Sequence, residues 1–588
     1  MDSNKAKEVE FTGIAASPGI AHGPVSLLRE KKISVPKYKL SSDRLESETE
    51  RFESALLATR MQIQAIRDEV QASLGEDEAR IFDAHLLVLE DQALIGETIR
   101  EMESSVENVE SCVWRVGNRY IEAFGQIDDE YLRERASDLR DVLRRLISNL
   151  TGQSLENADR MSDKHVVVAH DIAPSDSAMI DKSHLLGLAT DAGGKTSHTV
   201  IVARSMNIPA VVGLGNVSEQ IKPDDIVLVD GFEGRVVVNP SEATLYRYGK
   251  IKDEYASITK RLIALSQNVS QTKDGHPIQL MANIESEHEA KRAIEIGADG
   301  IGLFRTEYLF LNSKVLPTED QQYEAYKNTV ETMNGLPVVI RTFDLGGDKI
   351  SKIPELGRIG ESNPFLGYRA IRYCLDNIEF FTTQLRAILR ASAHGDIRIM
   401  YPMISGAPEL EKANEYLEIA KDQLRGESIP FNENLSAGSM IEIPSAATAC
   451  DTLVAGSSFF SIGSNDLIQY LIAVDRLNDR VAHLYEPTHP AVIRTLAQVV
   501  KAGRDGDREV SICGEMAGDP VLVPMLIGMG IESLSIAPGL LPNVKFVVQS
   551  MTLKEAKDLA KMAFSESDST TIYGNLLVFY KERMASLY

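Results

Sequence analysis

Hydrophobic residues change their spacing twice along the first half of the chain. Short apolar runs within residues 8–28 and 151–240 are typical of buried strands joined by turns. Between them, from about residue 41 to residue 150, apolar positions recur at helical spacing with charged residues in between. We therefore predict a helical domain over residues 29–150, inserted into an α/β domain formed by the two flanking segments.

Helix boundaries within this insertion follow from capping residues and glycines. Ser42 or Asp43 is a suitable N-cap for the first helix, and Leu74-Gly75 should end it. A second helical run is expected from near Asp77 through Ile95, followed by further periodic helices to about Leu150.

The second half of the chain alternates between apolar strands and helical runs. A charged, helical segment over residues 241–270 is predicted to connect the two halves. Over residues 271–588 the alternation predicts a (β/α)₈ barrel, and an open doubly wound sheet is the alternative because it alternates in the same way. The eight expected strands are Ile278–Ala282, Gly300–Phe304, Val338–Thr342, Ile397–Pro402, Gly438–Ile443, Phe459–Ile462, Val510–Cys513 and Leu534–Ala537.

Composition narrows the class of protein. The formal net charge of −24 over 588 residues argues against a nucleic acid as the main partner and leaves a basic protein partner plausible. The four cysteines lack disulfide or metal-ligand spacing, which indicates a reducing cytoplasm. No apolar signal core or membrane-spanning run is present in the sequence, so we expect a cytoplasmic protein without direct membrane insertion.

One histidine stands between a glycine pair and an apolar helix. Gly193-Gly194 allows a sharp turn, and His198 is flanked by the hydroxyl residues Thr196, Ser197 and Thr199. At the positive end of a helix, a phosphoryl group on His198 would meet free N–H groups and a favourable dipole. A capped helix carrying an incidental histidine is the alternative at this point.

Polar residues follow several of the predicted barrel strands, and the active site of a barrel lies at those carboxyl ends. Arginines can hold a small polyanion through forked contacts, and two carboxylates can bind Mg²⁺ together with substrate oxygens and water. A protonated thiol could act as an acid, with Glu515 disfavouring the thiolate. The candidates are Arg305, Arg341, Glu442, Asn465, Asp466, Arg476 and Cys513.

Each candidate also has an ordinary structural interpretation. An isolated arginine is more often part of a surface ion pair, a carboxylate after a strand can cap a helix, and Cys513 alone would be a small buried hydrophobe. The functional interpretation is favoured because these arginines, carboxylates and the asparagine all follow predicted strands at the same end of the barrel. We predict no chemistry for His85, which is expected to pack or contact a partner, or for His483 and His489, which could line the barrel mouth.

Taken together, the motifs resemble enzyme I of the phosphoenolpyruvate:sugar phosphotransferase system across nearly the whole chain. The segments that carry the resemblance are Ala16–Ala21, Glu78–His85, Gly193–His198, Gly300–Phe310, Arg341–Lys349, Met440–Pro444, Gly463–Leu467 and Cys513–Asp519.

The resemblance implies a two-step phosphoryl transfer. Phosphoenolpyruvate would bind the barrel and phosphorylate Nε2 of His198 with release of pyruvate, and the phosphoryl group would then pass to the carrier HPr, docked mainly on the inserted helices. It further implies a homodimer formed through the barrel. The implied roles are substrate contacts for Arg305, Arg341, Asn465, Asp466 and Arg476, Mg²⁺ binding by Glu442 and Asp466, proton donation by Cys513, and orientation of His198 by Ser177.

Two departures from the family pattern stand close to the site. Ser464 replaces the usual Thr, and Leu477 replaces a common Gly and puts the loop around Arg476 in question. The sequence does not separate Mg²⁺ from Mn²⁺. The alternatives are a regulatory member of the same family and a pyruvate-phosphate dikinase relative, although the sequence lacks the ATP-binding domain that a dikinase needs. Transfer between domains would require a hinge, for which Gly249 and the 241–270 segment are candidates.

Overall fold

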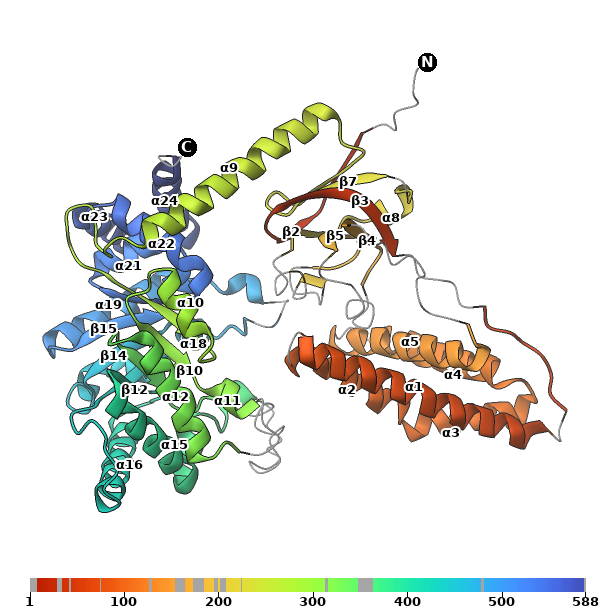
Figure 1. Ribbon diagram of the computed structural model, residues 1–588, viewed down its shortest axis with the longest axis horizontal. Coiled ribbons are helices and arrows are strands. Elements are labelled where there is room, and N and C mark those ends of the chain that lie inside the picture. The colour runs from red at the N-terminus through yellow and green to blue at the C-terminus, as the bar shows by residue number, and fades with distance from the viewer. Residues whose placement is uncertain are drawn as a thin grey trace. The chain divides into compact units, whose positions relative to one another are not determined.

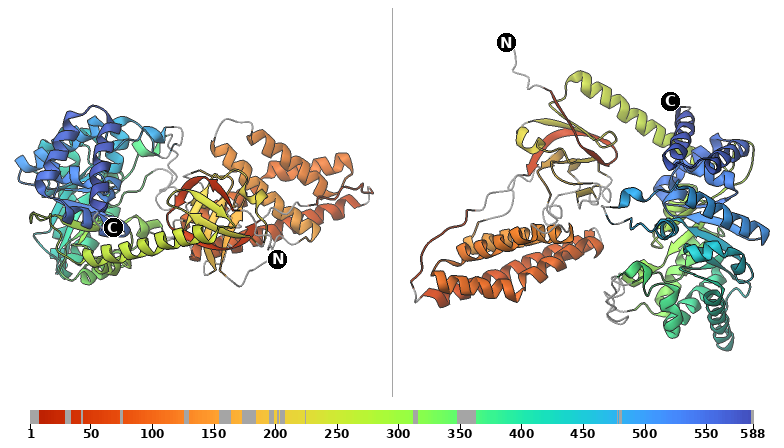
Figure 2. Two further views of the ribbon diagram at one scale, coloured as in Figure 1. Left: turned by 90° about the horizontal axis from the view of Figure 1, so that it is seen from above. Right: turned by 180° about the vertical axis from the view of Figure 1, so that it is seen from behind.

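The computed structural model divides the chain into two compact units, Met1–Tyr255 and Ala256–Tyr588, and each is described by itself (Figures 1 and 2). The structure describes the following residues: 8–28, 34–41, 44–73, 76–125, 130–153, 164–172, 184–194, 199–200, 203, 208–223, 225–311, 316–346, 363–476, 478 and 481–585.

The first unit contains an eight-stranded sheet in the order β1-β8-β7-β3-β4-β5-β6-β2. Its long central strand β3 (Ile20–Leu28) pairs antiparallel with β7 and parallel with β4, which joins the segment before the helical insertion to the segment after it. The other strands are β1 (Val9–Thr12), β2 (Ile14–Ser17), β4 (His165–Ala169), β5 (Leu185–Thr190), β6 (Ala210–Val212), β7 (Ile226–Asp230) and β8 (Arg235–Val238), with the short helix α8 (Val217–Gln220) before β7. Hydrophobic spacing did not single out β1 or β8.

In the described part of residues 29–151, the helices that form the predicted bundle are α1 (Leu45–Ser73), α2 (Glu76–Leu89), α3 (Gln92–Ser105), α4 (Val109–Gly125) and α5 (Glu130–Thr151). The prediction of one run from near Asp77 through Ile95 was wrong, because Asp91 separates α2 from α3. The Asp91 carboxylate accepts a hydrogen bond of 2.7 Å from the Ala93 N–H and so caps α3. Helix α1 ends where Leu74-Gly75 predicted its end, and those two residues, like Ser42 and Asp43, lie outside the described residues.

The predicted connecting helix is present as α9 (Glu242–Ser266). Within the first unit, its Tyr248 is buried against Ile20, Leu228 and Val237. Within the second unit, Ile258 packs with Phe546 and Val547. One continuous helix therefore contributes to the cores of both units.

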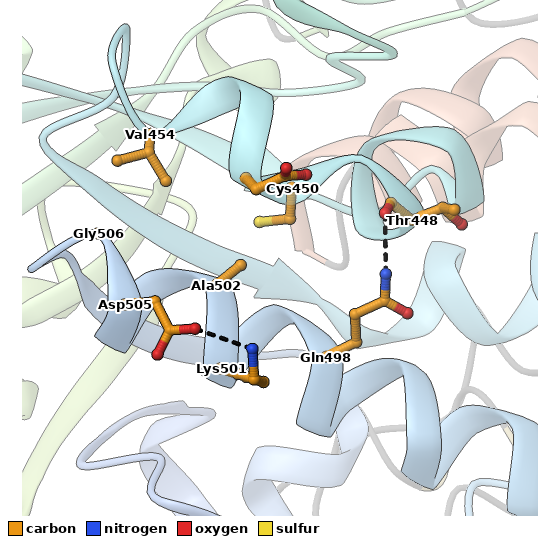
Figure 3. Close-up of a pocket in the computed structure, with 9 residues that line it drawn as sticks. Thr448, Cys450, Val454, Gln498, Lys501, Ala502, Asp505 and Gly506 are labelled. Atoms are coloured by element: carbon orange, nitrogen blue, oxygen red, sulfur yellow. Dashed lines mark hydrogen bonds and ion pairs between the residues drawn. The ribbon is translucent and has the colours of Figure 1, made fainter.

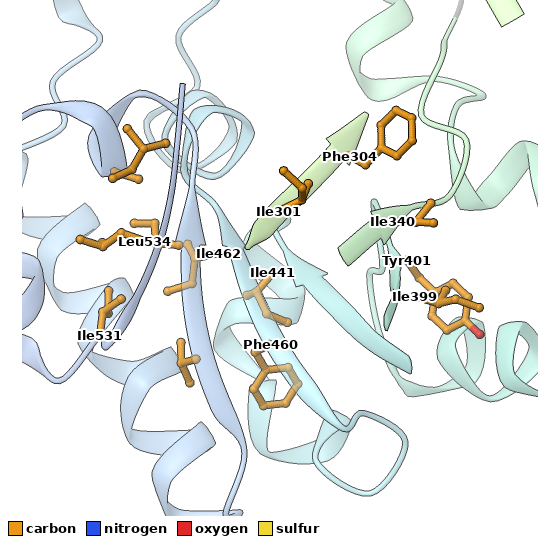
Figure 4. Packing of buried hydrophobic residues seen from close by; sticks show 14 of the residues in the cluster. Ile301, Phe304, Ile340, Ile399, Tyr401, Ile441, Phe460, Ile462, Ile531 and Leu534 are labelled. Carbon is orange, nitrogen blue, oxygen red and sulfur yellow. The ribbon is translucent and has the colours of Figure 1, made fainter. Parts of the chain in front are cut away.

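The second unit is a closed barrel of eight parallel strands, which confirms the barrel and excludes the open sheet. The strands are β9 (Gln279–Ile284), β10 (Ile301–Arg305), β11 (Val338–Arg341), β12 (Ile397–Tyr401), β13 (Ser436–Ile441), β14 (Phe459–Gly463), β15 (Glu509–Cys513) and β16 (Ser533–Ile536), with β9 pairing to both β10 and β16. Each of them overlaps one of the eight predicted strands. Figure 4 shows buried side chains such as Ile301, Ile441 and Phe460 on these strands.

Helices surround the barrel and bury apolar faces against it. They are α10 (Glu289–Glu295), α11 (Glu307–Leu311), α12 (Glu319–Met333), α14 (Ile371–Asp376), α15 (Ile378–Ala391), α16 (Ala407–Gly426), α17 (Pro444–Thr448), α18 (Ser464–Ile472), α19 (Pro490–Asp505), α20 (Glu515–Gly518), α21 (Val523–Met529), α22 (Leu541–Ser550), α23 (Leu553–Ser565) and α24 (Ser569–Met584). Short 3₁₀ turns are η3 (Pro364–Leu366), η4 (Ser392–His394), η5 (Cys450–Leu453), η6 (Ala482–Leu484) and η7 (Pro538–Leu540). Among the described residues, none of the helices combines the length and apolar character that a membrane crossing needs.

Candidate active site at the mouth of the barrel

The histidine loop of the first unit is described only at its base. His198 and Ser177 lie outside the described residues. At the start of the loop, Gly193 has a φ of 107°, a conformation that glycine adopts without strain. Just before it, the buried Asp191 carboxylate accepts hydrogen bonds from both the N–H and the hydroxyl of Ser218. The base of the loop is therefore fixed to α8.

The predicted strand-end residues of the second unit converge, because all eight strands are parallel in one closed barrel. Arg341 is central among them. Its guanidinium contacts Glu307 at 3.0 Å and Asp344 at 2.8 Å. These two carboxylates raise the pKa of Arg341 further above its usual value, against the opposing effect of burial. Arg341 is therefore a fixed, permanently charged group.

A fourth arginine, Arg369, belongs to the site and was not predicted. Its Nη2 contacts Asp344 at 2.8 Å and Asp466 at 3.3 Å, and its side chain is only 12 % exposed. The segment before η3 separates Arg369 from β11, so no strand-end position marked it in the sequence. The available signal was the glycine-flanked aromatic sequence Gly367-Tyr368-Arg369 between the third and fourth strands.

Three of the site arginines have an unused donor. Among the described residues, the Nε atoms of Arg341, Arg369 and Arg476 are buried without a hydrogen-bond partner. Buried N–H donors are nearly always satisfied by protein, water or a ligand. These three atoms are suited to receive oxygens of an anion at the barrel mouth.

Glu442 is the most buried carboxyl group of the site, at 2 % exposure. Its Oε1 accepts a 2.6 Å hydrogen bond from the Met403 N–H. Burial, followed by the charges of Asp344 and Asp466, raises the pKa of Glu442 to about 8. A carboxyl group in this environment binds a positive species, either a proton or a metal ion, more readily than an isolated one.

Cation binding is supported by the chemistry of the donors. Glu442 and Asp466 supply hard carboxylate oxygens, which suit Mg²⁺ with further oxygens from substrate and water. Within the part of the chain that the structure describes, no cluster of three or more His, Cys, Asp or Glu residues is arranged for a metal. The two-carboxylate prediction assigns the further ligands of the cation to substrate and water.

The Cys513 thiol is buried, and burial is the main cause that raises its pKa to about 11. Among the nearby charges, Glu442 raises this pKa, while Arg341 lowers it. The expected cause was wrong: Glu515 forms an ion pair with Arg476 at 3.3 Å and is not among the groups that shift the thiol. The thiol is therefore protonated at neutral pH.

The remaining candidates are partly buried. Arg305 contacts Glu285 at 2.7 Å, and Arg476 donates its backbone N–H to Gln469. The Asn465 side-chain oxygen accepts the Glu515 N–H at 2.9 Å. Leu477, which replaces the family glycine next to Arg476, lies outside the described residues.

The three histidines for which we predicted no chemistry are spread over the chain. His85 is fully buried in the bundle, at the edge of the Phe82 ring and with Nδ1 3.6 Å from Asp141, so its packing role is supported. His489 caps α19 by accepting the Ala491 N–H at 3.1 Å. His483 is part of η6.

A surface pocket of about 430 Å³ lies elsewhere in the second unit, between η5 and the end of α19 (Figure 3). Lys501 pairs with Asp505 there at 2.9 Å, and Gln498 donates to the Thr448 carbonyl. None of the strand-end residues lines this pocket. It is therefore a separate feature from the site at the barrel mouth.

The chain matches three family models of known proteins. They are "PEP-utilising enzyme, N-terminal" over residues 12–135, "PEP-utilising enzyme, mobile domain" over residues 161–234 and "PEP-utilising enzyme, PEP-binding domain" over residues 259–553.

Curated relatives match along nearly the whole chain. The phosphoenolpyruvate-protein phosphotransferase of Listeria monocytogenes is 41 % identical over 96 % of this chain and 98 % of its own length. The Bacillus subtilis protein of the same name is 38 % identical over 97 % and 99 %, and that of Haemophilus influenzae is 38 % identical over 96 % and 97 %.

Proposed function

Since the chain belongs to the phosphoenolpyruvate-protein phosphotransferases, within the PEP-utilising enzymes, we propose that it moves the phosphoryl group of phosphoenolpyruvate first to its own His198 and then to HPr. Pyruvate is the other product. The observation that carries this proposal is the convergence of Arg305, Arg341, Arg369 and Arg476 around two acidic oxygen donors at one end of a closed barrel.

The arginines and Asn465 bind the substrate. Three carry a buried Nε donor without a partner in the described chain, and an anion with several oxygens satisfies such donors. Arg341 and Arg369 are held by Asp344 before substrate arrives, so their charge is in position for the transferring phosphoryl group. Asp466 stands beside Arg369 and links the arginines to the cation site.

Mg²⁺ is the cation we propose for Glu442 and Asp466. Among the described residues, six carboxyl groups accompany the four arginines, so acidic groups outnumber basic ones where a trianionic substrate would bind, and a cation would reduce the repulsion. When bound, Mg²⁺ neutralises charge on the phosphate and on the departing enolate oxygen. The six carboxyl groups are those of Glu285, Glu307, Asp344, Glu442, Asp466 and Glu515.

Cys513 completes the first step as a proton donor. The bond between phosphorus and the enol oxygen breaks, and a bond forms between phosphorus and Nε2 of His198. The enolate that remains takes the thiol proton at its terminal carbon and becomes pyruvate. A thiol whose pKa is raised to about 11 by burial is in the protonated form that this step requires.

His198 and the barrel site belong to different units, so we assign separate tasks to the domains. Residues 8–28 and 151–240 carry the phosphohistidine, residues 29–150 dock HPr, and residues 271–588 bind substrate and form a homodimer. The 241–270 connector contains Gly249 and allows the phosphohistidine domain to visit the barrel and the carrier in turn. The reaction takes place in the cytoplasm.

Exposed apolar side chains on α1 and α2 support the bundle as the carrier site. Leu57, Met61 and Leu87 are 59 %, 67 % and 66 % exposed. An ion pair between Arg60 and Glu90 shows that this part of α1 runs beside the end of α2. Large apolar residues exposed on neighbouring helices are typical of protein contacts.

Labelled substrate tests the proposed function. The protein is incubated with Mg²⁺ and phosphoenolpyruvate carrying ³²P, and His198→Ala is compared with wild type and with His22→Ala, which changes an exposed histidine on β3. We expect acid-labile label on wild type and His22→Ala and none on His198→Ala. Full labelling of His198→Ala would refute the assignment of His198, and an unlabelled wild type would refute the function.

A further inference from the structure

The Tyr470 hydroxyl connects two parts of the barrel mouth that are far apart in sequence. Tyr470 lies on α18, four residues after Asp466 and therefore on the same side of the helix. Its hydroxyl donates a 2.6 Å hydrogen bond to the Phe365 carbonyl and accepts one of 3.3 Å from Nη1 of Arg369. The helix that carries Asp466 is thus joined to the segment that carries Arg369.

The backbone next to Arg369 is itself held in an unusual conformation. Ala370 is fully buried and has φ 54° and ψ −128°, a region that residues with a Cβ rarely adopt. Its N–H donates to the Leu345 carbonyl at 3.2 Å. Such strain persists only where the surrounding structure over-determines the conformation, and it is concentrated at functional sites.

A close backbone contact fixes the same segment from the other side. Gly346 pairs with Arg369 in an isolated bridge. A Cβ atom at Gly346 would lie 2.6 Å from the Arg369 Cβ, closer than real side chains approach. The contact of Gly346, the strain at Ala370 and the hydrogen bonds of Tyr470 therefore all act on one arginine.

The Tyr470 hydroxyl holds Arg369 in a different way from the carboxylates around it. Asp344 and Asp466 attract the guanidinium but also neutralise its charge. Tyr470 is half-buried, and burial raises its pKa to about 12, so it holds the guanidinium as a neutral group. The hydrogen bond therefore restricts the long side chain before an anion arrives without adding another negative charge beside it.

We propose that Tyr470 is a positioning residue for phosphoryl transfer: its hydroxyl fixes Arg369 beside Asp466 at the barrel mouth. This inference rests on the function proposed above. It predicts that removing the hydroxyl weakens catalysis only as long as Arg369 is present.

The test measures pyruvate released in a single turnover from phosphoenolpyruvate with Mg²⁺, in the full chain. Tyr470→Phe keeps the ring and removes the oxygen, and we expect kcat/KM to fall about 10- to 100-fold, the effect of losing a hydrogen bond to a charged group. Tyr401→Phe is the matched control. Tyr401 is a buried barrel tyrosine whose hydroxyl has no hydrogen-bond partner among the described residues, so this variant should match wild type.

A double-mutant cycle separates positioning from a general structural effect. In the Arg369→Ala background, adding Tyr470→Phe should cause no further loss, because the group on which Tyr470 acts is gone. The thermal midpoint of Tyr470→Phe should stay close to that of wild type. An equal further loss in both backgrounds would overturn the proposal, as would a Tyr470→Phe protein as active as Tyr401→Phe.

Two further outcomes lead to different conclusions about the function and about Tyr470. If wild type releases no pyruvate, the proposed function is refuted and the role of Tyr470 in it falls too. If Tyr470→Phe does not fold, Tyr470→Met takes its place in the same cycle, since methionine also lacks the hydroxyl and adapts to irregular space. It should lose activity when Arg369 is present but cause no further loss in Arg369→Ala. Full activity of folded Tyr470→Met would then overturn the proposal.

Discussion

A single methyl group at Gly463 provides a direct test of the proposed cation site. Gly463 ends β14, and its φ of −81° and ψ of 80° are accessible to alanine, so the effect of Gly463→Ala comes from space alone. The new Cβ would lie 2.7 Å from Oε2 of Glu442 and 2.8 Å from the Glu442 Cβ. Ordinary contacts begin at 3.4 Å, so the carboxylate must move by about 0.7 Å.

The size of this displacement sets the expected effect. Mg²⁺ demands near-ideal octahedral geometry at about 2.0–2.1 Å from its oxygens. A misplacement of about 1 Å can cost about 100-fold in rate, so the Mg²⁺ concentration for half-maximal pyruvate release should rise about 10- to 100-fold. Overpacking should also destabilise the barrel by about 1–3 kcal/mol, which calorimetry measures separately.

The assay is a Mg²⁺ titration of single-turnover pyruvate release, repeated with direct binding of Mn²⁺ followed by electron paramagnetic resonance. Gly574→Ala on α24 is the matched control because a Cβ there meets nothing within 4 Å. It should leave the metal dependence unchanged. A folded Gly463→Ala protein with the wild-type Mg²⁺ and Mn²⁺ dependence would refute Glu442 as a cation ligand.

Three further predictions concern other parts of the chain. Leu87→Glu on the exposed face of α2 should slow phosphate transfer to HPr about tenfold or more but spare the labelling of His198, and equal rates of transfer would refute this docking surface. Because the pKa of Cys513 is about 11, its thiolate fraction at pH 8 is about 100-fold below that of an ordinary thiol. The rate of its alkylation by iodoacetamide, mapped by mass spectrometry, should therefore keep rising above pH 9. The contribution of the protonated thiol to the free energy of unfolding should be lost as the pH rises from about 9 to 11. An alkylation rate that levels off near pH 9 would contradict the raised pKa of Cys513. Gly117→Ala puts a Cβ 2.2 Å from Leu143 and should destabilise the bundle by about 1–3 kcal/mol in chemical denaturation, whereas an unchanged midpoint would refute the close α4–α5 contact.

The barrel could be predicted from the sequence because its signal repeats. Each strand is a short apolar run that ends in polar residues, and eight such runs alternate with helices. The bundle was predicted for the same reason, except where α2 meets α3. There the apolar residues continue across Glu90 and Asp91, and the break depends on the carboxylate cap of Asp91, which the hydrophobic pattern does not contain.

Arg369 and the environment of Cys513 could not be predicted in this way. Arg369 reaches the site through the close approach of Gly346, and that contact joins residues that are far apart in sequence. The Cys513 thiol was expected to respond to Glu515, its neighbour in sequence. Its pKa is instead raised mainly by burial, and the leading charges are Arg341, which lowers it, and Glu442 after β13, which raises it. Spacing along the chain identifies which residues end a strand but not which charges face them across the barrel.

Ion pairing in the site divides the four arginines into two classes. Arg305 and Arg476 are 38 % and 30 % exposed, and their partners Glu285 and Glu515 are 57 % and 74 % exposed. Such surface pairs contribute only about 0–1 kcal/mol, so an anion can replace the carboxylates at little cost. Arg341 and Arg369 instead share the buried Asp344, whose loss would leave each of these two buried charges with only one carboxylate, Glu307 or Asp466. The inner pair therefore supplies a field that exists before substrate binds, and the outer pair is free to rearrange around the substrate as it arrives.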